Sequence, residues 1–222
     1  MACCFGSGGS DEPITEEMIG KSPNNEKLIK YLMNNQKFDI DMVEAPCKEP
    51  CCCLLSGLPF TCLCAQMKVR YDVLNHIYPG SEWTEYKCCQ GYFSPFCCYQ
   101  PGKCGEKSCP CCCLCLEVFC CAGPAASITR FMMMDKYKLG LDQGDRRLIK
   151  FNNCLQGLLF LTRCINVIAG SDKTRDCERI LQVIANIYYY TIQGCMLAQV
   201  HHEVKKRSRT DAPEYQRMED RE

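Results

Sequence analysis

Apolar residues recur at helical spacing in several parts of the chain and predict a mainly α-helical protein. Between Ala65 and Tyr78 they return every three to four positions, and Pro79-Gly80 then ends the helix. Another helix is expected from Pro124 to about Leu139, where Gly140 supplies a C-terminal stop. His76 falls in the last turn of the first of these helices, and we interpret it as a helix-end side chain.

The C-terminal half has the clearest pattern. Asp145–Ala169 carries apolar residues along one face, and Gly170-Ser171-Asp172 then provides a helix stop and the N-cap of a second helix that runs to about Lys206. Together they predict an antiparallel helical hairpin. Residues 180–200 contain no charge and could by length cross a bilayer. We favour a hairpin that packs on the rest of the protein or lies at a membrane surface, because four polar side chains share one face of this segment: Gln182, Asn186, Gln193 and Gln199.

Composition divides the chain into five parts. Residues 1–13 are expected to be a disordered leader, and residues 14–46 to hold a short amphipathic helix from Ser22-Pro23 to about Gln36. Residues 47–140 form an irregular cysteine-rich domain with short helices, residues 141–206 the hairpin, and residues 207–222 a disordered charged tail.

Most of the 24 cysteines lie between Cys47 and Cys121, in doublets and triplets set among apolar residues. The N-terminal residues lack the basic and apolar regions of a secretory signal, which favours the cytosolic face of a membrane or, alternatively, the cytoplasm. Thiols stay reduced there, so clustered cysteines indicate metal binding, lipid attachment or core packing.

Zinc is the candidate metal. The best ligand spacing is a polar, glycine-containing run, and its candidate ligands are Cys104, Cys109, Cys111 and Cys112. A clean second C-x2-C pair is missing from the sequence, and neighbouring cysteines point apart in extended backbone.

Lipid attachment is the competing interpretation. Cysteines among bulky apolar residues and close to the N-terminus are typical S-acylation sites, and the candidates are Cys3, Cys4, Cys113, Cys115, Cys120 and Cys121. One buried acyl chain binds a membrane only marginally, so stable attachment needs at least two.

Disulfides are the third interpretation. Cys111 and Cys121 are separated by nine residues, as are Cys154 and Cys164, and this spacing occurs in helical hairpins that are oxidised in an organelle. In the predicted hairpin, Cys164 and Cys177 are expected to lie roughly opposite one another.

One motif resembles a known family. The run Cys104-Gly-Glu-Lys-Ser-Cys109-Pro-Cys111 fits the C-x4-C-P-C signature of the placenta-specific-eight family, which are small cysteine-rich eukaryotic proteins. The four intervening residues are polar here, whereas they are usually apolar in that family. The resemblance covers about residues 47–140, and it implies membrane association and metal or ion handling without a known reaction.

Charge and motifs narrow the functional classes. The chain holds 26 basic and 26 acidic residues, which argues against nucleic acid as a partner. It has no phosphate-binding glycine loop, serine elbow or paired-histidine metalloprotease motif, and neither catalysis nor a small-molecule substrate is expected. His201-His202 are expected to be solvated, and Met132–Met134 to fill the core.

These observations favour a non-enzymatic protein at the cytosolic face of a membrane. It would be attached through acylated cysteines and would offer its hairpin to a protein partner. The alternatives are a zinc-stabilised cytosolic binding or metal-handling module and a disulfide-stabilised protein of an oxidising organelle.

Overall fold

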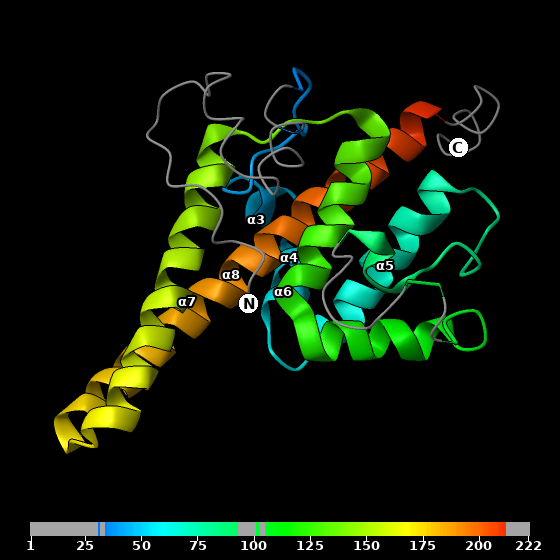
Figure 1. Ribbon diagram of the computed structural model, residues 1–222. Coiled ribbons are helices and arrows are strands. Elements are labelled where there is room, and N and C mark those ends of the chain that lie inside the picture. Colours follow the sequence, from blue (N-terminus) through cyan, green and yellow to red (C-terminus); the bar gives the residue numbers. More distant parts are fainter. Residues whose placement is uncertain (1–30, 32–33, 93–100, 103–104, 212–222) are drawn as a thin grey trace, which may run out of the picture.

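The computed structural model of the protein describes residue 31 and residues 34–92, 101–102 and 105–211. In these residues there is no extended strand, and the mainly α class is confirmed (Figure 1). The helices are α3 (Ala45–Lys48), α4 (Pro50–Gly57), α5 (Cys62–Ile77), α6 (Pro110–Tyr137), α7 (Gln143–Ala169) and α8 (Asp172–Asp211), with a short 3-10 helix, η2 (Cys88–Gly91), between α5 and α6.

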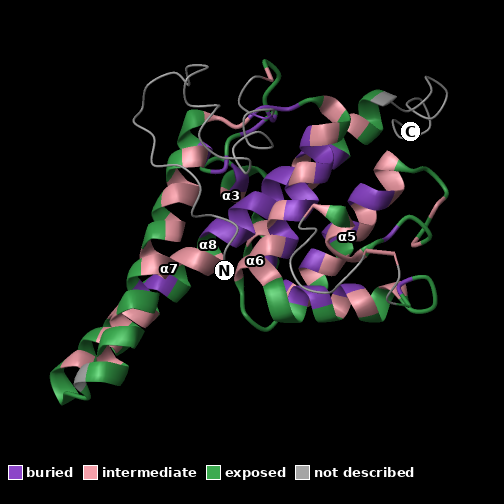
Figure 2. Ribbon diagram, viewed as in Figure 1, coloured by how far each residue is buried: buried purple, intermediate pink, exposed green. Residues whose placement is uncertain are grey.

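Helix α8 passes through the middle of the molecule. Its residues 192–200 are all buried, and α3, α4, α5 and α6 pack around this half of it (Figures 1 and 2). Helix α4 crosses α8 closely because a glycine stands on each helix at the crossing: a Cβ atom on Gly194 would lie 3.1 Å from the Cα atom of Gly57. The predicted polar face of this segment is divided: Gln193 and Gln199 are buried, and Gln199 donates to the carbonyl of Ile40, whereas Asn186 is exposed.

Helix α6 is sharply bent. Cys121 leaves helical geometry, with φ −140° and ψ 51°, three residues before Pro124. Proline lacks an N–H group and its ring clashes with the carbonyl four residues earlier, which kinks the helix. The second half agrees with the helix predicted after Pro124, whereas residues 110–120 form an additional helical half (Figure 1). Among the described helices, α6 alone is long and apolar enough to cross a membrane, and 33% of its most apolar window is buried in the protein.

The main hydrophobic core lies between α5, α6 and the C-terminal half of α8. Val73, Leu74 and Ile128 are completely buried in it. Met132–Met134 are also buried, so the prediction that the methionine run fills the core is confirmed.

A buried ion pair joins the second half of α6 to the first turn of α7. Arg130 contacts Asp145 at 2.5 Å, and both side chains are about 1% exposed. The same carboxylate accepts hydrogen bonds from the side chain of Gln199 on α8 and from the backbone of Met42. Asp145 therefore fixes the base of α7 against three other parts of the fold.

Beyond this base, α7 and α8 project from the body side by side, and we call residues 150–191 the arm (Figure 1). The two helices are joined by a two-residue turn at Gly170, which has the left-handed φ of 59° typical of a helix stop. Across the arm, Gln156 donates to the carbonyl of Ala185, and Asn166 donates to Glu178. Figure 2 shows that much of the arm is exposed.

Several boundaries differ from the sequence prediction. Helix α5 begins at Cys62 rather than Ala65, and α8 continues to Asp211. The prediction of a disordered tail from residue 207 is therefore wrong for residues 207–211. Arg207 extends the helix because it bonds to Glu203 one turn earlier and lies over the ring of Tyr137.

Two further expectations need correction. His202 is not simply solvated, because its ring nitrogens lie 3.2 Å from carboxylate oxygens of Asp39 and Glu49. The amphipathic helix predicted up to Gln36 lies largely outside the described residues, and Gln36 itself is not helical but forms a bridge with Leu139. Residues 1–13 and 212–222 also lie outside the described part.

Candidate functional site

The first half of α6 exposes apolar and thiol groups along one side. Leu116 is 63% exposed and Phe119 is 79% exposed. Cys112 and Cys120 lie four residues before and after Leu116, on the same side of the helix, and they are exposed too. The opposite side of the helix is buried through Leu114, Glu117 and Val118. Glu117 is the one charged residue in 110–120, so the exposed side carries no charge.

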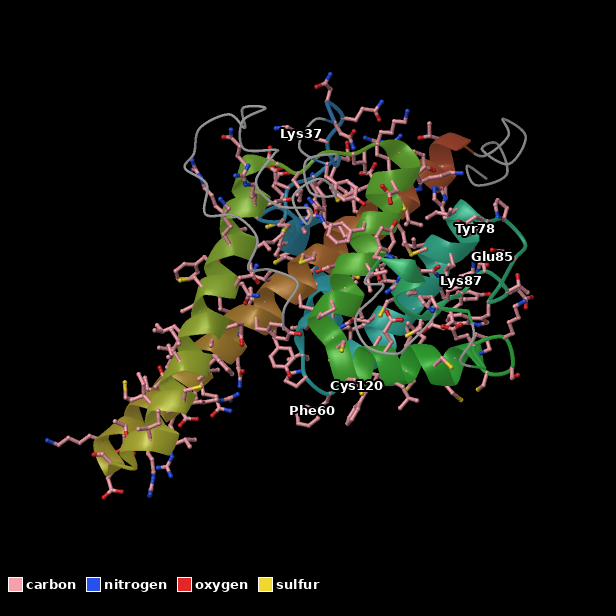
Figure 3. All side chains as sticks on the ribbon, in the orientation of Figure 1. Lys37, Phe60, Tyr78, Glu85, Lys87 and Cys120 are labelled. Carbon is pink, nitrogen blue, oxygen red and sulfur yellow. The ribbon has the colours of Figure 1, made fainter. Side chains whose placement is uncertain are left out.

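The last turn of α4 and its connection to α5 add a second apolar group. Phe60 is 94% exposed and Leu54 is 62% exposed, and they are accompanied by the partly exposed Leu55 and Leu58. Figure 3 places Phe60 and Cys120 at the same edge of the molecule. We call the set Leu54, Leu55, Leu58, Phe60, Cys112, Leu116, Phe119 and Cys120 the cysteine–apolar surface.

Helix α8 contacts both parts of this surface from within, through Tyr189 and Tyr190. The ring of Tyr189 lies against Gly123, next to the kink of α6, where a Cβ atom would be 2.8 Å from the phenolic oxygen. Burial raises the pKa of Tyr189 to about 12, although a hydrogen bond with the backbone of Gly123 acts in the opposite direction. The carbonyl oxygen of the next residue, Tyr190, would lie 3.2 Å from a Cβ atom on Gly57 at the end of α4, so adjacent residues of α8 contact both helices that carry the surface.

Contiguous apolar side chains without charge are unusual on the surface of a soluble monomer. Such patches mark contacts with a membrane or another protein. Exposed thiols are also chemically accessible, whereas buried thiols act as small apolar groups. The cysteine–apolar surface therefore combines a non-polar contact area with groups that can be modified.

The predicted lipid-attachment cysteines differ in accessibility. Cys120 and Cys121 are exposed at the bend of α6, whereas Cys113 and Cys115 are partly buried on the flanks of the same helix. Cys3 and Cys4 lie outside the described residues. Since α6 already forms at Pro110, its exposed side also includes Cys112, which the sequence placed among the zinc candidates.

The predicted zinc cysteines lie at the start of α6. Cys109 precedes the helix, Cys111 and Cys112 are in its first turn, and all three are exposed; Cys104 lies outside the described residues. The Cys112 thiol hydrogen-bonds to Cys109, which lowers the pKa of the Cys109 thiol and raises that of Cys112. The arrangement makes Cys109 the more nucleophilic of the two at neutral pH.

A different group comes together inside the protein. The sulfur atoms of Cys88 and Cys89 and a carboxylate oxygen of Glu117 all lie within 4.8 Å of one another. This cluster was not predicted from the sequence, because Glu117 is 28 residues from Cys89 and is the one acidic residue in the apolar run 110–120. A single acidic residue within an apolar helical run is the sequence signal that could have identified Glu117, because a buried carboxylate needs polar partners.

Glu117 is the centre of a buried polar network. Its carboxylate accepts hydrogen bonds from Arg70 at 3.0 Å, from the Tyr86 hydroxyl at 3.0 Å and from the Cys89 backbone at 2.8 Å. The side chains of Arg70 and Glu117 are each 1% exposed. Burial raises the pKa of the Tyr86 hydroxyl, and a hydrogen bond with Cys88 raises the pKa of the Cys89 thiol, so both groups are neutral at pH 7.

The described cysteines form no disulfide. Cys111 and Cys121 lie on opposite halves of the bent α6, and Cys154, Cys164 and Cys177 are exposed on the arm. The sulfur atoms of Cys53 on α4 and Cys195 on α8 approach to 4.0 Å. Burial raises the pKa of Cys195 to about 12, which makes it a core thiol rather than a reactive one.

Comparison with known proteins finds no matching family model, no matching curated protein and no matching solved structure. The fold and the site define a helical, cysteine-rich protein whose surface joins exposed thiols to apolar side chains. The resemblance of Cys104–Cys111 to the placenta-specific-eight signature stays a prediction.

Proposed function

We propose that the protein is a non-enzymatic, peripheral protein of the cytosolic face of a membrane, attached by S-acylation at the cysteine–apolar surface. The observation that carries the proposal is the exposed, charge-free side of residues 110–120, where Cys112 and Cys120 flank Leu116 and Phe119. Its role is that of an interaction module held at the membrane.

The energetics favour attachment by several weak contributions. Burying one large apolar side chain contributes about 1.5–3 kcal/mol, so Phe60, Leu116 and Phe119 together support transient contact with the acyl region. Each acyl chain adds about 0.8 kcal/mol per buried methylene, and two chains make the attachment stable. The first contact brings the thiols to the membrane surface, and the acyl chains then retain the protein there.

Helix α6 enters this proposal as a surface helix rather than a span. Its bend at Cys121 divides the apolar window into two short halves, and the second half is packed in the core through Ile128 and Met133. A straight helix of about 20 residues is needed to cross the hydrocarbon layer. The half formed by residues 110–120 has the length and one-sided exposure of a helix that lies along the membrane.

The experiment is membrane partitioning of the full chain in eukaryotic cells. We expect the wild type in the membrane fraction, with thioester-linked lipid on intact mass spectrometry and release by hydroxylamine. Serine replacement of Cys112, Cys120 and Cys121 should move the protein to the soluble fraction. The matched control replaces the three exposed arm cysteines, Cys154, Cys164 and Cys177, and should leave partitioning unchanged. A wholly soluble wild type without lipid contradicts the proposal.

A second candidate function is a zinc-stabilised module, favoured by the Cys88–Cys89–Glu117 cluster. Two thiolates and a carboxylate are suitable zinc ligands, and structural zinc takes four. Elemental analysis of the reduced protein should then give one zinc per chain, lost when Cys88 and Cys89 are both replaced by serine. Replacement of Cys109, Cys111 and Cys112 is the control, because those thiols form the separate exposed set. If wild-type protein from which the metal has been removed keeps the far-UV circular dichroism of the untreated protein, this function is excluded.

A further inference from the structure

The arm carries an exposed heptad pattern on α7. Spacings of three and four residues alternate along one side of the helix, and every member is exposed: Phe151, Cys154, Leu158, Leu161, Ile165 and Ile168. Apolar residues with a period of 3.5 are the pattern of a helix that packs against other helices in a coiled coil or bundle. In this chain α8 contacts that side at Phe151, whose half-exposed ring packs edge-on against Tyr188, and the members further along the arm are also exposed.

Helix α8 carries a matching pattern. The residues Cys177, Ile180, Ile184, Ile187 and Thr191 follow the same alternation, and all of them are exposed. The three isoleucines in this series are 50–64% exposed, although residues of this type are usually buried. We call these eleven residues of α7 and α8 the arm seam.

Both halves of the arm seam lie on the same side of the arm. On α7, Ile165 immediately precedes Asn166, which bonds to α8; on α8, Ile184 immediately precedes Ala185, which bonds to α7. Leu158 likewise immediately precedes the buried Leu159, so the seam of each helix lies one position before residues that face the other helix. Because the helices are antiparallel, the same offset turns both seams to one side of the pair.

The other side of the arm has a different character. It is formed by the residues that follow, by one position, those that face the other arm helix. These residues include the apolar Phe160 and Val167 and the charged Arg163 and Arg179. Further along α8, the ring of Tyr189 lies against Gly123 of the body, and the backbone carbonyl of Tyr190 lies against Gly57. The arm seam therefore faces away from the cysteine–apolar surface and contains no charged residue.

We propose that the arm seam binds the arm seam of a second copy of this chain and forms an antiparallel four-helix bundle. A two-fold axis through the arm would bring two identical faces together, and each copy would supply two of the four helices. The bundle would bury the isoleucines and leucines that are exposed in a single copy.

The apolar area fits such a dimer. Eight large seam side chains are about half or more exposed, and they offer on the order of 100 Å² each, or about 800 Å² per copy. That area is what one partner contributes to a standard stable interface. No charge of the arm seam would have to be desolvated.

The charges beside the arm seam favour a protein occupant over a lipid surface. Helices that lie on membranes have cationic polar faces. On the arm, Arg163 is paired with Glu178, Arg175 with Asp172, and Arg179 with Asp176, so these cations are compensated within the chain.

The test uses sedimentation equilibrium of the full, reduced and unacylated chain. We expect a dimer, and the substitution Leu161→Glu should weaken it by at least about 100-fold, because the interface would bury two unpaired carboxylates. The matched control is Phe160→Glu: Leu161 is 58% exposed and Phe160 is 56% exposed, but Phe160 lies on the other side of the arm. The control should remain dimeric, and both variants should keep wild-type circular dichroism because both positions are exposed.

Three outcomes overturn the proposal. One is a monomeric wild type at about 100 μM, well above the micromolar range reached by interfaces of this size. Another is equal dissociation by both substitutions. The third is a monomer that binds phosphatidylcholine vesicles and loses that binding with Leu161→Glu, which would assign the arm seam to lipid. This test needs no acylation, so its result is independent of the proposed function.

Discussion

The substitution Glu117→Gln tests the buried network at the centre of the fold. Glutamine keeps the shape of the side chain and can still accept hydrogen bonds from Tyr86 and the Cys89 backbone. It removes the negative charge that faces Arg70 at 3.0 Å, where both side chains are 1% exposed. At this distance, and with an effective dielectric constant of about 20, the lost attraction is about 5 kcal/mol. We therefore expect a loss of about 3–5 kcal/mol in the free energy of unfolding, as found when one partner of a buried pair is removed.

The assay is urea unfolding of the reduced full chain, followed by far-UV circular dichroism. Two control variants define the cause. Adding Arg70→Met to Glu117→Gln removes the uncompensated cation and should recover at least half of the loss. Asp72→Asn breaks the exposed pair with Lys68 at 2.5 Å and should cost only about 0.3–0.5 kcal/mol.

Two results would refute the reasoning. A loss below about 1 kcal/mol for Glu117→Gln would mean that the pair is not held in a dry interior, since surface pairs are worth that little. A double variant as unstable as the single one would mean that the stranded charge of Arg70 is not the source of the cost.

The remaining predictions concern packing, ionisation and thiol reactivity. Gly194→Ala should destabilise the fold by about 1–3 kcal/mol in the same urea assay, because its Cβ atom would lie 2.5 Å from the carbonyl oxygen of Cys53 on α4; an unchanged midpoint contradicts this close crossing. The pKa of Asp142 is lowered by its hydrogen bond with Lys37, so Asp142→Asn should be less stable than the wild type at pH 7. That difference should begin to shrink as the pH falls to about 4, where the unfolded carboxylate takes up its proton, and it should vanish below the lowered folded pKa, where both states are protonated; a difference that persists there rules out the charge of Asp142 as the cause, because asparagine can still cap α7. Cys109 should react with iodoacetamide at a lower pH than an ordinary cysteine, and Cys112→Ala should shift its rate profile to higher pH; an unshifted profile in mass-spectrometric mapping rules out the hydrogen bond as the cause.

The site could be predicted only in part. The sequence indicated that Cys120 and Cys121 lie among apolar residues, and it separated them from the polar run at Cys104–Cys109. It did not indicate that residues 110–120 are helical, so it could not place Cys112 beside Leu116 on an exposed side. The exposed Phe60 lies at the same edge as Cys120 because α4 and α6 both pack against α8, and no local pattern connects these positions.

The sequence by itself determined the helical class, the stops at Pro79-Gly80 and Gly170, and the core methionines. These features depend on local propensity and on a spacing of three to four residues, which a short window contains. Only the tertiary structure decided which faces are covered. It paired Arg70 with Glu117 and Arg130 with Asp145, and it left the arm seam exposed. Burial depends on contacts between residues far apart in the chain, so one apolar stripe became core along α8 whereas another of similar pattern remained on the surface of the arm.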